Sequence, residues 1–147
     1  MSKDKLLLVE DNPSDVALAQ EAFAECGVTE EIVLAKDGAE ALDYLLGPAS
    51  AKGEEAAGLP RLVLLDLRLP KIDGLEVLQR VRSDGRTKRV PIVVLTTSTE
   101  EGDVARAYDL GCNGFVQKTM SLDRFIESIR VIKSFFLELN VRPPQPR

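Results

Sequence analysis

The chain has 147 residues, of which 44% are hydrophobic and 29% are charged, as is ordinary for a globular domain with its own core. Its net charge of −5 argues against a surface devoted to nucleic acid, and no apolar run approaches membrane-spanning length. The absence of histidine excludes a Ser-His-Asp triad, a histidine base, a histidine-ligated zinc ion and a phosphohistidine carrier within these residues.

Short apolar runs alternate with amphipathic stretches five times along the chain. This alternation predicts a doubly wound α/β fold around a parallel sheet. We expect strands over residues 5–9, 31–35, 62–65, 90–95 and 114–118, and helices over residues 13–26, 37–46, 73–82, 98–110 and 121–139. The run at residues 62–65 contains only Leu and Val, which is typical of a strand buried on both faces.

Helix starts are marked by residues that can cap an N-terminus, namely Asn12, Asp37, Asp73, Ser98 and Ser121. The last helix carries an apolar stripe at helical spacing, formed by Leu122, Phe125, Ile126, Ile129, Ile132 and Phe136. Val131 and Phe135 lie roughly opposite that stripe, so a monomer would leave them uncovered. We interpret residues 47–60, which have no apolar period, as a mobile surface loop.

Polar side chains stand at the carboxyl ends of four of the five predicted strands, either directly after the strand or as its last residue. Glu10 and Asp11 follow the first, Asp66 the third, Thr96 the fourth and Lys118 ends the fifth. Because the carboxyl ends of parallel strands meet at one edge of the sheet, we expect these side chains to lie together.

Three carboxylates in one crevice repel each other unless a cation intervenes, and hard oxygen ligands suit Mg²⁺. Lys118 and Thr96 supply a charge and a hydroxyl that can hold a phosphoryl group. Asp66 can then act as the nucleophile that forms an aspartyl phosphate. A flavodoxin-like binder of a phosphorylated cofactor is the weaker alternative, because residues 10–13 are Glu-Asp-Asn-Pro where such a binder needs a glycine-rich loop.

With these residues in place, the chain resembles the receiver domain of two-component response regulators from Lys5 to about Phe136. The matching positions are Glu10, Asp11, Asp66, Thr96 and Lys118, with Pro70 and Gly74 following Asp66. The resemblance implies a (βα)5 sandwich of strand order 2-1-3-4-5, with two helices on one face and three on the other. It also implies that Asp66 accepts a phosphoryl group from a histidine kinase.

The resemblance assigns further roles by position. Asp11 would bind Mg²⁺ directly, Glu10 mainly through water, and Asp66 and the backbone carbonyl of Arg68 would complete the protein ligands. Thr96 and Lys118 would bind the phosphoryl oxygens, and Phe115 would be the switch aromatic whose rotamer follows Thr96. The protein would then be no enzyme toward a separate substrate, and would promote only its own phosphorylation and dephosphorylation.

The resemblance is also to single-domain regulators that serve phytochrome-type histidine kinases. It implies a receiver domain over residues 1–140 that signals through protein contacts. The prolines of residues 141–147 predict an extended tail. Charge and hydropathy predict no contact with nucleic acid or membrane. The resemblance further implies a homodimer through the helix at 98–110, the strand at 114–118 and the helix at 121–139, including Val131 and Phe135. We expect a cytoplasmic protein, because no secretory signal opens the chain.

The sequence departs from the family pattern at Thr119, where most members have a proline after a cis peptide bond. A cis bond before a non-proline residue costs about 3–4 kcal/mol, so the state of the Lys118–Thr119 bond is left open. Arg68 and Ser98 lie two residues after Asp66 and Thr96 and flank the path of a hydrolytic water. A pseudo-receiver, an interaction module with an unused phosphorylation site, is therefore the rival interpretation.

Overall fold

The middle layer of the molecule is a five-stranded parallel sheet of order β2-β1-β3-β4-β5. The computed structural model describes residues 4–47, 59–119 and 121–144. Its strands are β1 (Lys5–Val9), β2 (Glu31–Ala35), β3 (Leu62–Leu65), β4 (Ile92–Thr96) and β5 (Gly114–Gln117). The doubly wound α/β fold and its strand order are confirmed.

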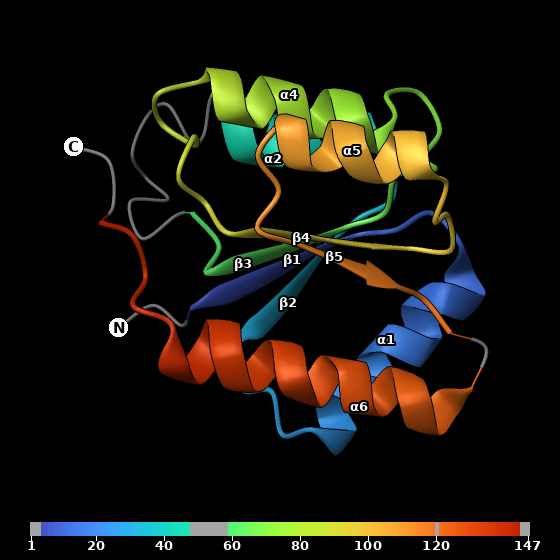
Figure 1. The fold of residues 1–147 in the computed structure, drawn as a ribbon. Coiled ribbons are helices and arrows are strands. Elements are labelled where there is room, and N and C mark those ends of the chain that lie inside the picture. Colours follow the sequence, from blue (N-terminus) through green and yellow to red (C-terminus); the bar gives the residue numbers. More distant parts are fainter. Residues whose placement is uncertain (1–3, 48–58, 120, 145–147) are drawn as a thin grey trace.

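Helices cover both faces of the sheet. They are α1 (Pro13–Glu25), α2 (Gly38–Leu46), α4 (Gly74–Ser83), α5 (Glu101–Asp109) and α6 (Leu122–Ile132), which continues into the π-helix η1 (Lys133–Leu139). Figure 1 shows α2, α4 and α5 above the sheet and α1 and α6 below it. None of the described helices is long and apolar enough to cross a membrane.

Two apolar clusters fill the space between the sheet and its helices, because successive strand residues point to opposite faces. Val63 and Leu65 of β3 pack in the cluster under α2 and α4, whereas Leu62 and Leu64 pack in the cluster against α1 and α6. All four side chains of β3 are buried. The central position of β3, between β1 and β4, explains its uninterrupted apolar sequence.

The strand register brings the carboxyl ends of the strands to one edge. Val9 pairs with Leu65, Leu65 with Val94, and Thr96 with Gln117. This edge lies on the right in Figure 1, where α1 begins after β1 and α5 begins after β4. The segment that follows η1, drawn in red, lies on the opposite side.

Three local predictions are wrong. The strand expected at residues 90–95 is β4, Ile92–Thr96, because Pro91 lacks the backbone donor of a strand residue. Ser98 does not cap α5; the helix begins after Glu100 without a side-chain cap, and the Ser98 hydroxyl instead donates to Asp103. Leu122, expected in the buried stripe, is 40% exposed because it is the first residue of α6.

The end of the last helix differs from an ordinary α-helix. The prediction extends the stripe to Phe136, but Leu137 is the buried residue and Phe136 is only partly buried. A π-helix repeats contacts at i and i+5, so the buried position after Ile132 moves one residue along the chain. Most of the predicted loop at residues 47–60 lies outside the described residues.

Candidate functional site

Asp66 follows directly after β3 and is almost completely buried, with 7% of its surface exposed. One carboxylate oxygen, Oδ2, accepts a hydrogen bond of 2.9 Å from Lys118 Nζ. The other, Oδ1, accepts one of 3.2 Å from the backbone N–H of Arg68. Both oxygens of the carboxylate are therefore held in place.

Lys118, one residue after β5, is the cation at the centre of the site. Besides Asp66, its ammonium contacts Glu10 Oε1 and lies 3.1 Å from Asp15 Oδ2. Burial by itself lowers the pKa of Lys118, but the hydrogen bonds to Glu10 and Asp66 outweigh burial and hold that pKa above its usual range. The lysine therefore remains a permanent positive charge among three carboxylates.

Glu10, Asp11 and Asp66 form the acidic group predicted from the strand ends. Each offers a carboxylate oxygen, and these oxygens all lie within 4.8 Å of one another. Glu10 and Asp66 are buried, whereas Asp11 is exposed. Hence one side of the group is enclosed by protein and the other is open to solvent.

The electrostatics of Glu10 fit a further cation at this place. Burial raises the pKa of Glu10 to about 7, because the loss of water outweighs the hydrogen bond and charge of Lys118. One lysine is therefore insufficient to keep the acidic group fully ionised. Clustered carboxylate oxygens are the donors that hard divalent cations prefer, so these residues fit such an ion.

Thr96 is the last residue of β4 and is fully buried. Its Oγ1 accepts a 3.3 Å hydrogen bond from the backbone N–H of Ser98. The strand order places β4 between β3 and β5, so Thr96 stands between the strands that carry Asp66 and Lys118. The predicted Asp66, Thr96 and Lys118 therefore lie at the ends of three adjacent strands.

A second polar network lies next to Asp66 and is formed by Arg68, Ser98 and Asp103. The Arg68 side chain turns toward α5, where its Nη2 lies 2.6 Å from Asp103 Oδ2 and 3.9 Å from a carboxylate oxygen of Glu100. The Ser98 hydroxyl donates to the same Asp103 oxygen at 2.8 Å. Asp103 thus connects the residues two positions after Asp66 and two positions after Thr96.

Sequence reasoning missed both Asp15 and Asp103 as members of these networks. Asp15 lies in the first turn of α1, where the Asn12 side chain accepts hydrogen bonds from Ser14 N and Asp15 N. An acidic residue at this place is accounted for by the positive end of the helix, so its sequence position gave no sign of a contact with Lys118. Asp103 carried no local signal, because its partner Arg68 is 35 residues away in sequence.

The loop after Asp66 requires glycine at position 74. A Cβ added there would lie 2.3 Å from the Asp66 carbonyl oxygen and 2.6 Å from Leu67 Cα. The Gly74 N–H donates to the Leu67 carbonyl at 3.0 Å, which closes the loop onto the strand end. This close packing fixes the backbone that carries Asp66.

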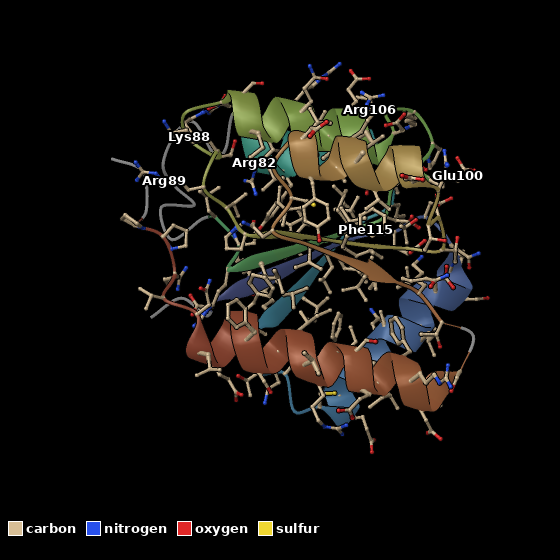
Figure 2. The ribbon with its side chains drawn as sticks, in the orientation of Figure 1. Arg82, Lys88, Arg89, Glu100, Arg106 and Phe115 are labelled. Atoms are coloured by element: carbon tan, nitrogen blue, oxygen red, sulfur yellow. The ribbon has the colours of Figure 1, made fainter. Side chains whose placement is uncertain are left out.

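Phe115 and the Lys118–Thr119 bond are the remaining predicted features. Phe115 is half-buried against the apolar cluster under α2 and α4. Figure 2 shows that its side chain points from β5 toward α5. The described residues contain no cis peptide bond, so the Lys118–Thr119 bond is trans. Thr119 instead forms a local turn, in which its hydroxyl accepts from Ser121 N at 2.9 Å.

Comparisons with known proteins agree with this site. A family model described as the response regulator receiver domain matches residues 6–130. The chain is 43% identical to the probable methanogenesis regulatory protein FilR2 of Methanothrix harundinacea over 143 residues, which cover 96% of this chain and 88% of FilR2.

Solved structures are similar over nearly the full chain. The phosphorylated cyanobacterial phytochrome response regulator RcpA is 42% identical, with a TM-score of 0.85 over 97% of this chain and 100% of RcpA. The Mn²⁺-bound form of response regulator Rcp1 of Synechocystis is 37% identical, with a TM-score of 0.82 over 96% of this chain and 99% of Rcp1. By sequence, fold and arrangement of its strand ends, this chain belongs to the response regulator receiver domain family.

Proposed function

We propose that Asp66 accepts a phosphoryl group from the phosphohistidine of a sensor histidine kinase. The observation that supports this most directly is the 2.9 Å contact between Asp66 Oδ2 and Lys118 Nζ at the edge of an acidic group. A buried lysine held by ion pairs is a fixed charge with which phosphoryl oxygens can pair. The similar protein RcpA is described in its phosphorylated form, which agrees with this reaction.

In the proposed reaction, a carboxylate oxygen of Asp66 forms a bond to phosphorus as the phosphorus–nitrogen bond of the donor breaks. The electron pair of that bond leaves with the histidine ring of the kinase. Lys118 offsets negative charge on the phosphoryl oxygens, and the Thr96 hydroxyl donates a hydrogen bond to one of them. These groups act by position and charge, as a largely dissociative phosphoryl transfer requires.

Glu10, Asp11, Asp66 and the backbone carbonyl of Arg68 are the groups that would hold Mg²⁺. When bound, the ion supplies positive charge that offsets charge developing on the transferred phosphoryl group. Of the three carboxylates, only that of Asp11 is exposed to solvent. Glu10 carries the raised pKa, so its ionisation gains most from a neighbouring cation.

The output of this receiver is a protein contact. Phe115 changes its packing when Thr96 turns toward the phosphoryl group, and the half-buried position of Phe115 supports this role. The partner kinase is of the phytochrome type; the description of the similar protein RcpA as a phytochrome response regulator supports this pairing. The protein acts on no separate substrate and promotes only the phosphorylation and dephosphorylation of Asp66.

Two copies of the chain associate through α5, β5 and the last helix, which comprises α6 and η1. The support for this dimer is apolar surface on these elements, since Tyr108 is 54%, Val131 60% and Phe135 48% exposed. In addition, β5 is an edge strand whose other side pairs with no strand among the described residues. Burying such surface against a second copy removes it from water.

Mass spectrometry after incubation with Mg²⁺ and a small phosphodonor tests the phosphoacceptor. We expect one phosphoryl adduct on the wild type, none on Asp66→Asn, and an undiminished adduct on Asp109→Asn. Asp109 is an exposed aspartate at the end of α5 and provides the matched control. A folded wild type that forms no adduct would instead identify an inactive, pseudo-receiver module.

A further inference from the structure

A second candidate site lies at the edge of the sheet opposite to Asp66. A cavity of about 530 Å³, open to solvent, is lined by residues 59–61 before β3, by the connection between α4 and β4, and by residues 142–144 after η1. Figure 2 shows Lys88 and Arg89 on the left, on this side, and Glu100 on the right, near the strand ends that carry the phosphoacceptor. The cavity is therefore separate from the receiver site.

The lining of this cavity is strongly basic in a chain of net charge −5. It contains five cationic and no acidic residues, the cationic ones being Arg61, Arg86, Lys88, Arg89 and Arg142. These side chains come from three separate stretches of sequence, so the tertiary fold alone brings them together. Like charges collected in one concavity raise the local potential and favour an anion.

The protein supplies only part of the counter-charge. Arg86 pairs with Asp84 at 3.1 Å, while Arg61 and Arg142 share Asp4 at 3.7 Å and 2.8 Å. Lys88 and Arg89 are exposed and have no ion pair with the described part of the chain. Two full cations are therefore available to a ligand.

Arg61 is the least exposed arginine of the lining, with 19% of its side-chain surface accessible. Its Nε is buried without a hydrogen-bond partner among the described residues, and is therefore closed to a ligand. Only the accessible part of the side chain can contact an anion in the cavity.

The rest of the lining is mainly apolar. It includes the rings of four prolines and two aliphatic side chains, namely Pro60, Pro91, Pro143, Pro144, Leu59 and Val90. Proline rings present a stiff surface on which a flat ring can pack. The volume falls in the range of small-molecule pockets, and guanidinium groups match phosphate oxygens in a fork geometry.

We propose that this cavity binds a phosphorylated small molecule that carries an aromatic ring, in the chemical class of the nucleotides. Phosphate groups lie against Arg61, Lys88 and Arg89, and the aromatic ring lies against the prolines of the lining. A long polyanion such as nucleic acid fits less well, because the cations are confined to one concavity of an otherwise acidic protein. This site goes beyond the proposed phosphotransfer and does not depend on it.

Isothermal titration of the whole chain with ATP tests the site. EDTA is included, so that no divalent ion supports binding at Glu10, Asp11 and Asp66. We expect saturable binding of one ATP with a dissociation constant below about 100 μM, a moderate affinity for a site with few fixed contacts. Asp66→Asn should bind ATP equally well.

The matched variants are Arg89→Glu in the cavity and Arg124→Glu at the start of α6, which change the net charge equally. We expect at least a tenfold weaker affinity for Arg89→Glu and less than a twofold change for Arg124→Glu. Both residues are exposed, so both variants should retain the wild-type unfolding temperature. An equal loss in both variants would indicate diffuse attraction and overturn the site.

Other ligands separate the parts of the proposal. Tripolyphosphate carries the same charged groups without a ring. If tripolyphosphate binds as tightly as ATP, the proposed contact between the ring and the prolines of the lining is overturned. Tighter binding of polyglutamate or of duplex DNA would overturn the assignment to a small molecule. The absence of heat with ATP up to 1 mM would overturn the whole proposal.

Discussion

At the scale of single residues, one lysine and one aspartate organise the two polar networks around Asp66. Lys118 contacts Glu10, Asp15 and Asp66, and thereby collects the acidic residues at the strand ends. Asp103 holds the Arg68 side chain, which is 61% exposed and would otherwise be free to swing toward Asp66. Because Arg68 follows Asp66 by two residues, this contact bears on how easily an anion reaches the phosphoacceptor.

Asp103→Asn should accelerate phosphorylation of Asp66 by an anionic small phosphodonor. The change releases the Arg68 guanidinium, which can then attract the donor; we expect a roughly fivefold faster rate, equivalent to about 1 kcal/mol for an exposed charge pair. In an Arg68→Ala background the same change should alter the rate less than about twofold. The measurement is the rate of phosphoprotein formation in all four variants. Equal acceleration in both backgrounds would mean that Asp103 acts through its own charge and not through Arg68.

At the scale of elements, the segment between β3 and α4 is fixed by two glycines that allow close backbone contact. A Cβ on Gly74 would lie 2.3 Å from the Asp66 carbonyl oxygen, and a Cβ on Gly38 would lie 1.8 Å from the Ile72 carbonyl oxygen. The start of α2 and the start of α4 are thus packed against the two ends of one loop. The position of Asp66 therefore depends on helices that contribute no side chain to its site.

Gly74→Ala should destabilise the fold by about 2 kcal/mol or more, because the added methyl group meets backbone atoms that cannot rotate away. Gly85→Ala is the matched control, since a Cβ at Gly85 meets nothing within 4 Å. We expect the control to change the free energy of unfolding by less than about 0.5 kcal/mol or to increase it slightly. Urea unfolding of both variants measures the difference. Equal stability of the two variants would show that the loop can move to accept a side chain.

The N-terminus of α2 provides a pH-dependent contribution to stability. The hydrogen bond from Glu40 N, together with the charge of Lys71, holds the pKa of Asp37 below its usual range. A lowered pKa in the folded state means that the carboxylate stabilises the fold at neutral pH and that this contribution disappears as pH falls through that lowered value. Asp37→Asn keeps a capping oxygen but does not titrate.

We therefore expect the free energy of unfolding of Asp37→Asn to fall less steeply than that of the wild type on going from about pH 5 to about pH 3. Chemical unfolding at a series of pH values measures both profiles. Parallel profiles would contradict a contribution from Asp37. A control variant, Asp109→Asn, changes an aspartate for which no such contact is found among the described residues and should follow the wild type.

At the scale of the whole molecule, the two proposed interaction surfaces are formed by different residues. The apolar surface with Val131 and Phe135 is on α6 and η1, whereas the basic cavity lies at the opposite edge from the phosphoacceptor. The Phe135 ring also packs edge to face on Phe136, with ring centres 4.9 Å apart. Phe135 is thus held in a defined orientation while nearly half exposed.

Sedimentation of Phe135→Asp tests the dimer. A charge at this position would have to be buried in the interface, so we expect the variant to sediment as a monomer at concentrations where the wild type is dimeric. Val141→Asp, at a residue that is 90% exposed, introduces the same charge outside α5, β5, α6 and η1 and should leave the mass unchanged. A wild type that is monomeric at every concentration would exclude this interface in the unphosphorylated protein.

The local pattern of the sequence determined most of the fold. The predicted limits of β1, β2 and β3 match the structure to the residue. For β3 the physical reason is plain, because all four of its side chains are apolar and buried. Capping side chains likewise located the starts of α1, α2 and α4, where Asn12, Asp37 and Asp73 accept hydrogen bonds from the first helical turn. Since parallel strands end at one edge, the same pattern brought together the acidic group, Thr96 and Lys118.

Only the tertiary structure decided the contacts that join separate elements. Asp15 reaches Lys118 because α1 begins beside the end of β5, and Asp103 reaches Arg68 because α5 begins beside the end of β3. The Ser98 hydroxyl bonds to Asp103 and not to the helix N-terminus, although its local sequence predicts a cap. Local spacing determines which backbone conformation a segment prefers. The partner of a charged side chain is set by the packing of whole elements, which no short stretch of sequence encodes.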